Sequence, residues 1–239
     1  MTDRKAELAA NLAQVEERIA ASCAAAGRER DDVTLVVVTK TYPASDVRIL
    51  HELGVRHVAE NRDQDAAPKA TACADLSLTW HFVGQLQTNK VRSVTSYADI
   101  VQSVDRPKLV TALSTAAVRG ERELGCLIQV ALDAESGERG ERGGVAPDGV
   151  EELADAIAGA PGLRLGGLMT VAPLAGEYAG RQRAAFERLM EIASRMRSAH
   201  PAANMVSAGM SGDLEDAVAA GATHVRVGTA VLGVRPRLG

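Results

Sequence analysis

The sequence predicts an α/β protein that folds as a single (β/α)8 TIM barrel with an extra N-terminal helix. Its 239 residues suit one barrel domain spanning 1–239. Eight short β-rich runs alternate with helical patterns, which implies parallel pairing through right-handed crossovers. A count of eight favours a closed barrel over an open doubly wound sheet, whose usual count is about five or six.

The extra helix is expected within residues 1–27. Apolar residues recur there at helical spacing, at Leu8, Leu12, Val15, Ile19 and Cys23. Gly27 then favours a stop. One face of this helix must therefore pack on the barrel, where it would either cap the lower end or extend the outer ring of helices.

The predicted strands follow in order at 34–40, 57–61, 79–84, 100–105, 126–132, 163–171, 204–209 and 224–233. Several are almost wholly apolar, which is typical of a sheet covered on both faces. Helical patterns at 150–160 and 182–200 precede the sixth and seventh strands. The Gly/Glu/Arg-rich stretch 133–149 is expected to be a loop on the face where βα loops gather.

Composition excludes several classes of function. Aromatic residues are only 3%, the formal net charge is -4, and Lys and Arg are scattered, so no nucleic-acid partner is expected. No apolar run approaches the roughly 20 residues that span a bilayer. The cysteines Cys23, Cys73 and Cys126 are odd in number and lack CxxC spacing, which suits a reducing cytoplasm. We expect a soluble cytoplasmic protein.

The sequence comes close to a zinc-binding helix motif and to a glycine-rich phosphate loop, but it matches neither. The histidines of HELGVRH, His51 and His57, are six positions apart rather than four, so they leave a common helical face and predict no zinc site. The glycines of 133–149 fit neither GxGxxG nor GxxxxGK[ST], and no GxSxG is present.

Lys40 is the first candidate for chemistry. In this fold the active site lies at the carboxyl ends of the strands, and Lys40 ends the first predicted strand. A desolvated lysine there loses its proton and can form a Schiff base with an aldehyde or ketone. The alternative is a structural lysine that reaches from the strand end to water.

Two segments indicate a phosphate site across the barrel mouth from Lys40. Ser211 lies at the expected start of a helix after strand seven, with Asp213 in its first turn, and Gly228 and Thr229 close strand eight. Loops after these two strands often bind phosphate in this fold. The alternative is an ordinary helix cap and a strand-breaking glycine.

Arg226 is the third candidate, because alternation places it on the same face as Gly228 and Ala230. If that face lines the barrel, its guanidinium needs a structural carboxylate, a ligand ring nitrogen or a phosphate as partner. A lysine for an aldehyde, a phosphate site and an arginine together fit pyridoxal 5′-phosphate (PLP), although their spacing alone does not name that cofactor.

The motifs VVVTKTYP, VAENRDQDA, WHFVGQLQTNK, LIQVAL, GLMTVAP and VSAGMSGDLEDAVAAGATHVRVGTAVLG run in order from about residue 34 to 233. In these segments the chain resembles the PLP homeostasis proteins of the YggS/PROSC type. That resemblance implies a fold similar to the N-terminal barrel of bacterial alanine racemase, without the racemase's second domain.

The resemblance also implies roles for single residues. Lys40 would be the Schiff-base lysine, Asn61 would lie near the cofactor ring, and Arg226 near the pyridine nitrogen. The phosphate would be surrounded by Ser207, Ser211, Gly228 and Thr229, with Met210 in the same loop. His81 and Met169 belong to matching motifs and are further candidates. The chain departs from the family pattern at Arg62, where an aromatic residue is common.

The implied function is a PLP carrier in intracellular PLP homeostasis, without catalytic turnover and with PLP-dependent apo-enzymes as recipients. An arginine opposite the ring nitrogen would leave the pyridine unprotonated and a weak electron sink. A racemase also needs a second acid–base group, for which the chain offers only Tyr42, Tyr97 and Tyr178. The alternatives are a PLP-dependent racemase or decarboxylase of weak or narrow activity, and a lysine aldolase without cofactor.

Overall fold

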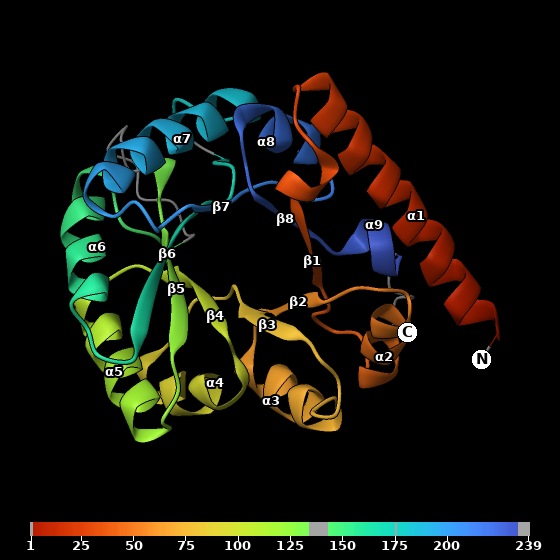
Figure 1. Ribbon diagram of the computed structural model, residues 1–239, viewed down its shortest axis with the longest axis horizontal. Helices are drawn as coiled ribbons and strands as arrows, with labels where there is room; N and C mark the ends of the chain where they lie inside the picture. The colour runs from red at the N-terminus through yellow and green to blue at the C-terminus, as the bar shows by residue number, and fades with distance from the viewer. Residues whose placement is uncertain (1, 134–142, 175, 234–239) are drawn as a thin grey trace.

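Eight parallel strands close into a barrel in the order of the sequence, with β8 paired back to β1 (Figure 1). The structure is a computed structural model that describes residues 2–133, 143–174 and 176–233. Its strands are β1 (Thr34–Val38), β2 (His57–Glu60), β3 (Thr79–Phe82), β4 (Ile100–Val104), β5 (Leu124–Gln129), β6 (Leu163–Met169), β7 (Met205–Ser207) and β8 (His224–Val227). The predicted fold class is confirmed.

Helices surround this barrel and cover the outer face of the sheet (Figure 1). They are α1 (Thr2–Ala25), α2 (Ala44–Glu52), α3 (Asp63–Ala72), α4 (Val91–Tyr97), α5 (Pro107–Arg119), α6 (Val150–Ala158), α7 (Gln182–Ala199), α8 (Leu214–Ala220) and α9 (Thr229–Leu232). Short 3-10 turns are η1 (Arg30–Asp32), η2 (Thr88–Lys90) and η4 (Pro147–Gly149). Within the described residues, no helix is long and apolar enough to cross a membrane.

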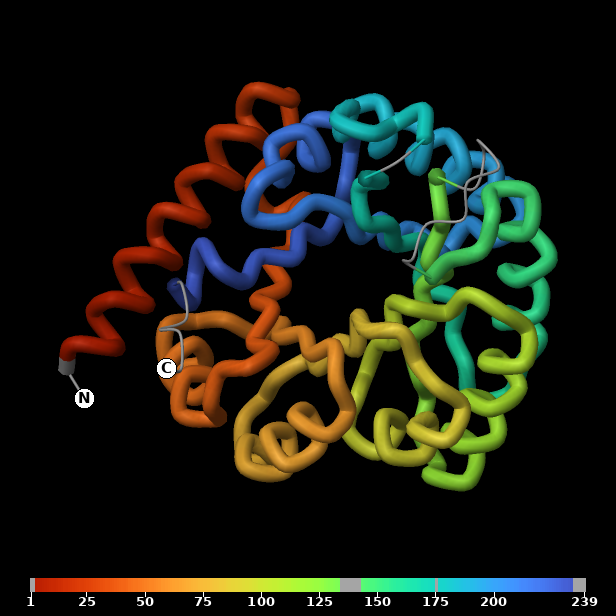
Figure 2. Tube along the Cα trace, turned by 180° about the vertical axis from the view of Figure 1, so that it is seen from behind, coloured from red at the N-terminus to blue at the C-terminus, as the bar shows by residue number. Residues whose placement is uncertain are grey.

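Helix α1 extends the outer ring of helices and does not cap the lower end of the barrel (Figure 2). Leu8, Val15 and Ile19 are buried against the barrel's helices, as their spacing predicted. The side chains of Arg4 and Asn11 donate hydrogen bonds to the carbonyls of Leu232 and Val231 at 3.0 Å each. The first helix is thereby tied to the last one.

Strand ends are where the predictions were wrong. β1 ends at Val38 and not at Lys40, because the chain turns there. β8 ends at Val227, and the residues predicted to continue it form α9, with Gly228 at the N-cap position. The alternation that placed Ala230 on the same strand face as Arg226 therefore stops at Gly228. Residues 134–142 of the predicted loop 133–149 lie outside the described residues.

The apolar core has two parts. A small cluster of Ile100, Leu127 and Met169 lies inside the barrel, and much larger clusters fill the space between the strands and the helices. The cysteines Cys23, Cys73 and Cys126 are buried free thiols. Burial raises the pKa of Cys126 to about 12, which makes this thiol inert in the folded protein.

Candidate functional site

Lys40 lies in a tight turn just beyond β1, at the carboxyl end of the barrel. The Tyr42 amide donates to the Thr39 carbonyl at 3.1 Å, which makes Lys40 and Thr41 the two central residues of the turn. Thr41 has φ 72°, a left-handed conformation that is unusual for a β-branched residue. Lys40 is exposed, and no ion pair or hydrogen bond engages its ammonium within the described part of the chain.

A buried polar cluster fixes the residue before Lys40. The Thr39 hydroxyl donates to Glu60 Oε1 at 2.6 Å, and Lys69 Nζ donates both to the Thr39 carbonyl at 2.8 Å and to Glu60 Oε1 at 2.5 Å. Lys69 and Glu60 are both buried. The two lysines therefore have different surroundings. Lys69, on α3, is buried in an ion pair with Glu60, whereas Lys40 is exposed at the mouth of the barrel and unpaired within the described residues.

The loop after β7 is arranged differently from the prediction. α8 begins at Leu214 and not near Ser211, because residues 210–213 close a turn first. Asp213 is the residue before the helix and not part of its first turn, and its Oδ1 accepts a hydrogen bond from the Met210 amide at 2.5 Å. Burial raises the pKa of the Asp213 carboxyl above its usual range. Ser211 is half-buried and Met210 is 38% exposed.

The loop after β8 is short because it enters α9 at once. Gly228 comes close to β1: a Cβ added there would lie 3.2 Å from the Val38 carbonyl oxygen. The exposed Thr229 is the first residue of the helix. Among the described residues, no carbonyl accepts a hydrogen bond from the amides of Thr229, Ala230, Ser211 or Gly212. Free amides of this kind can receive an anion.

Closure of the barrel brings these segments together on successive strands. Ser207 ends β7 and residues 208–211 follow it, Gly228 and Thr229 follow β8, Lys40 follows β1 and Asn61 follows β2. The loops predicted to bind phosphate therefore lie beside Lys40 and not across the mouth from it, since β8 pairs directly with β1. Asn61 is half-buried, and its backbone is in close contact with Gly84 after β3.

Arg226 is buried inside the barrel beneath these loops. Its Nη1 donates to the Ser207 hydroxyl and its Nη2 to the Thr170 carbonyl, both at 2.7 Å. No carboxylate of the described residues forms an ion pair with it, so desolvation lowers its pKa to about 10. At neutral pH the guanidinium is still charged, with N–H groups left to donate.

A chain of hydrogen bonds continues from Arg226 across the barrel. A guanidinium can only donate, so the Ser207 hydroxyl accepts from Arg226 and donates its own proton to Gln102 Oε1 at 2.7 Å. The Gln102 amide then donates to His81 Nδ1 at 2.8 Å, and His81 Nε2 lies 3.0 Å from His57 Nδ1. The direction of donation makes His81 a neutral ring protonated on Nε2.

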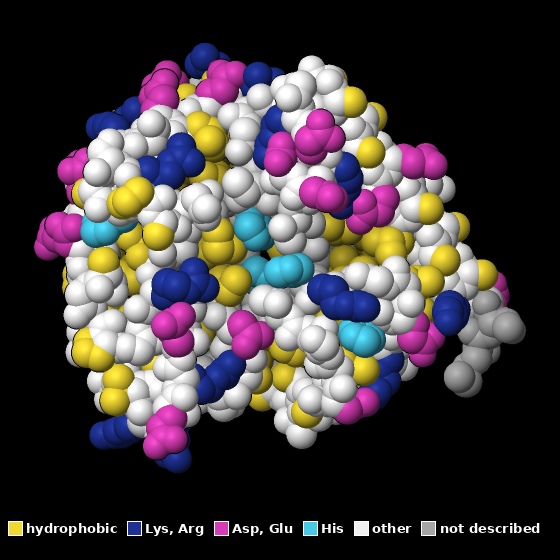
Figure 3. All heavy atoms as spheres, viewed as in Figure 1, with side chains coloured by type: hydrophobic (Ala, Val, Ile, Leu, Met, Phe, Trp, Pro, Cys, Tyr) yellow, Lys and Arg dark blue, Asp and Glu magenta, His cyan; other side chains and the backbone are white. Residues whose placement is uncertain are grey.

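Three histidines gather at the start of β2, in β3 and at the start of β8. The ring of His224 lies 6.4 Å from those of His57 and of His81, centroid to centroid. Figure 3 shows histidine side chains around the central hollow of one face. Desolvation is the largest cause that lowers all three pKa values: moderately for His57, far for His81, and to about 4 for His224.

The comparisons with known proteins agree with one another. A family model described as "Alanine racemase, N-terminal domain" matches residues 7–236. The "Pyridoxal phosphate homeostasis protein" of Mycobacterium tuberculosis (strain ATCC 25618 / H37Rv) is 42% identical over 253 residues, covering 98% of this chain and 95% of that protein. The protein of the same name from Escherichia coli (strain K12) is 35% identical over 232 residues, covering 96% and 97%.

The chain belongs to the pyridoxal phosphate homeostasis protein family. The solved structure of PipY from Synechococcus elongatus PCC7942 with PLP bound is similar at a TM-score of 0.80 and 31% identity, covering 95% of this chain and 100% of that one. Alanine racemase of Clostridium difficile 630 shares the fold at a TM-score of 0.70 and 14% identity, with 58% of that chain covered.

Within this family member, two further candidates lie deep in the barrel. His81 is 0% exposed and bonded to Gln102, while Met169 is 1% exposed and packs on Ile100 and Leu127. Arg62, where the resemblance led us to expect an aromatic residue, is exposed and immediately precedes α3.

Sequence reasoning missed Gln102, Glu60 and Lys69, which hold Ser207 and Thr39 in place. A signal was present for Gln102, since a glutamine inside the apolar run IVQSV requires a buried partner. Its partners Ser207 and His81 could not be read from spacing, because they come from other strands.

Proposed function

We propose that this chain binds PLP in intracellular PLP homeostasis, holding it as a Schiff base on Lys40. The observation that carries the proposal is the free amine of Lys40 beside two loops with free amides, on the successive strands β1, β8 and β7. PipY, a relative that covers nearly all of this chain, was solved with PLP bound, which supports the same ligand here.

The residues present fit this cofactor. PLP supplies an aldehyde, with which an amine condenses as water leaves, and a phosphate that suits free backbone amides. Ser211, Gly228 and Thr229 would bind the phosphate, with Met210 at the edge of the same loop. Asn61 would border the ring. In the arrangement described here the one proton of the Ser207 hydroxyl is used by Gln102, so Ser207 would act mainly by holding Arg226.

Arg226 would face the ring nitrogen. With a pKa of about 10 it stays protonated at neutral pH and can only donate, which favours an unprotonated pyridine nitrogen. An unprotonated ring withdraws electrons weakly. This argument favours a carrier over a racemase or decarboxylase.

Two of the three tyrosines, Tyr42 and Tyr97, are already engaged, which also favours a carrier. The Tyr42 hydroxyl donates to the Gly233 carbonyl at 2.6 Å, and the Tyr97 hydroxyl lies 3.5 Å from Asp63 Oδ1. Neither is a free second acid–base group at the mouth. We propose that PLP-dependent apo-enzymes receive the cofactor from this protein. We also propose that the protein is located in the cytoplasm, because its three buried free thiols suit a reducing compartment.

The test is a reduction experiment on the purified protein. With added PLP, the wild type and a Lys90→Ala control should turn yellow, and borohydride should fix one label, located by peptide mass spectrometry, on Lys40. Lys40→Ala should stay colourless, because Lys69 is held in an ion pair with Glu60 and Lys108 lines a groove on the outer wall of the barrel. A label on another lysine in the wild type would contradict the proposal.

The same samples decide between a carrier and an enzyme. Wild-type protein with PLP is incubated with a panel of amino acids in D2O, and exchange of the α-proton is followed by NMR. A carrier exchanges no faster than free PLP. Turnover that disappears in Lys40→Ala would replace the carrier by a PLP-dependent enzyme.

A further inference from the structure

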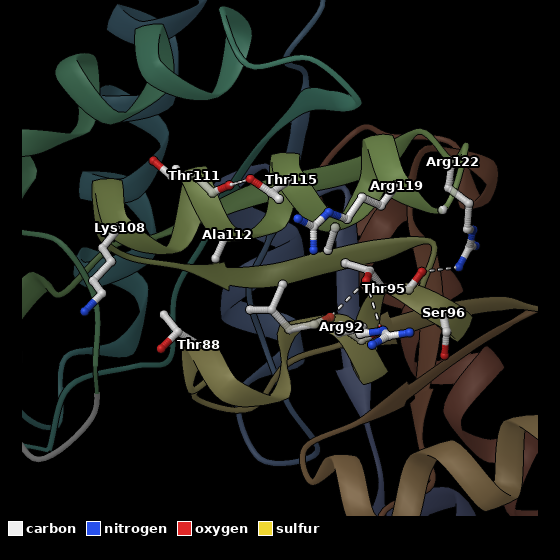
Figure 4. A pocket seen from close by; sticks show the side chains of 13 residues that line it. Thr88, Arg92, Thr95, Ser96, Lys108, Thr111, Ala112, Thr115, Arg119 and Arg122 are labelled. Carbon is white, nitrogen blue, oxygen red and sulfur yellow. Dashed lines mark hydrogen bonds between the residues drawn. The ribbon is translucent and has the colours of Figure 1, made fainter.

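A groove of about 940 Å³ lies on the outer wall of the barrel between α4 and α5, away from the site described above (Figure 4). Four cationic side chains line it: Arg92, Lys108, Arg119 and Arg122. No aspartate or glutamate is among the residues that line the groove.

The positive charge of this groove is largely uncompensated. Arg122 forms an ion pair with Asp99 at 3.0 Å, but within the described residues Arg92, Lys108 and Arg119 have no carboxylate partner. Such a concentration contrasts with the formal net charge of -4 of the whole chain. A groove lined by one sign of charge attracts ligands of the opposite sign.

The groove is elongated. Lys108 and Arg119 are eleven positions apart on α5, which corresponds to about 16 Å at about 1.5 Å per residue. Figure 4 shows Lys108 and Thr88 toward one end and Arg119 and Arg122 toward the other. A single small anion cannot touch both Lys108 and Arg119.

The floor of the groove between these cations is formed by small, uncharged side chains. Ala112 and Ala116 leave room for another element to approach α5. The hydroxyls of Thr111 and Thr115 donate to backbone carbonyls one turn earlier, at 3.3 and 2.9 Å, so they have no proton left to offer an anion. Along α5, recognition therefore depends on the cations and on the small side chains between them.

We propose that this groove docks an acidic α-helical segment of a partner protein. Carboxylates spaced along such a helix can reach both ends of the groove, and its backbone can pack on the alanine floor. A nucleic acid fits less well, since no aromatic side chain lines the groove for base stacking.

The docked helix would end next to the barrel mouth. α5 follows β4, so its first turn, which carries Lys108, lies at the carboxyl end of the strands. This inference does not depend on PLP binding, and the two can fail separately.

The test uses a fluorescein-labelled synthetic helix of alanine with glutamates spaced to one face, and a matched peptide with glutamine in place of every glutamate. Fluorescence anisotropy should show binding of the acidic peptide only. Lys108→Glu and Arg119→Glu should each raise its Kd about fivefold, and the double variant about 25-fold, because exposed pairs contribute modestly and nearly additively. Higher salt should weaken binding.

Arg195→Glu on α7, which does not line the groove, is the control and should leave the Kd unchanged. Circular dichroism checks that each variant is folded. Equal binding by all folded variants would overturn the proposal, as would displacement of the peptide by millimolar inorganic phosphate. If a single-stranded oligonucleotide binds more tightly than the acidic peptide, and Lys108→Glu and Arg119→Glu weaken its binding equally, the ligand of the groove is a nucleic acid and not an acidic helix. If light scattering shows that the wild type is a dimer and the double variant a monomer, the groove binds a second copy of this chain and not a different partner.

Discussion

Gly84 shows how one residue can hold the mouth of the barrel together. A Cβ at this position would lie 2.0 Å from the backbone carbonyl oxygen of Asn61, a distance that no side chain tolerates. The loop after β3 therefore packs directly on the end of β2, where Asn61 borders the candidate site. A methyl group here would push apart two neighbouring loops.

Gly84→Ala should lower the free energy of unfolding by about 2–4 kcal/mol, because the clash is with backbone and cannot be relieved by a rotamer change. Urea denaturation monitored by circular dichroism measures this. Gly159→Ala is the matched control, since its Cβ would lie 3.4 Å from the Asp155 carbonyl oxygen, an ordinary contact. A loss at Gly84 no larger than at Gly159 would show that the two loops are not in contact.

Helix α1 supports the candidate site from outside the barrel. Arg18 donates through Nη2 to the Ser211 carbonyl at 2.9 Å and pairs with Glu215 of α8 at 2.7 Å. Its neighbours on the same helix reach the end of α9. The element added to the barrel thus contacts the loop after β7 and the helix that follows β8, the two segments proposed to bind phosphate.

Arg18→Met should speed the release of PLP several-fold while changing stability by only about 1 kcal/mol, because it frees the Ser211 loop but removes one part-buried hydrogen bond and one exposed ion pair. The rate is measured by loss of the yellow absorbance with a scavenger of free PLP present. Lys5→Met is the control, since Lys5 pairs with Glu52 of α2 at 2.7 Å, away from the loops. Equal release from both variants would contradict a supporting role for α1.

At the scale of the whole molecule, the barrel interior concentrates basic groups. His57, His81 and His224 gather below Arg226, and Asp99 is the acidic group whose charge favours protonation of His57. Burial, together with repulsion from Arg226 and between protonated histidines, keeps the His81 and His224 rings neutral in the folded protein. The same rings protonate freely once the protein is unfolded.

Stability should therefore fall as the pH drops. His224 titrates near 6.5 unfolded and at about 4 folded, so its contribution is complete above about pH 6.5 and is lost between about pH 6.5 and 4. Because the His224 ring is not fully buried, solvent screening limits the stability lost through its protonation to about 2 kcal/mol. The urea concentration at the midpoint of unfolding should fall less steeply from pH 7.5 to 4.5 in His224→Gln than in the wild type.

The control is His51→Gln on α2, which should keep the wild-type slope. A His224→Gln curve parallel to that of the wild type would refute the argument.

The fold could be predicted because its signals are local. Each strand–helix unit is written in a short stretch of sequence, and eight such units allow few topologies. Lys40, Gly228 and Thr229 could be named as candidates because they were placed at the ends of predicted strands. The errors at Lys40, Ser211 and Gly228 concern where a strand or helix begins or ends, which depends on turn hydrogen bonds that periodicity does not encode.

The sequence by itself determined the barrel, the extra helix and the strand ends that carry polar residues, since periodicity and spacing act over a few residues. Only the tertiary structure decided that the loops proposed to bind phosphate lie beside Lys40, that Arg226 is held by Ser207 and through it by Gln102, and that four cations share one outer groove. These residues are far apart along the chain, and they meet only because the barrel closes and brings β8 back to β1.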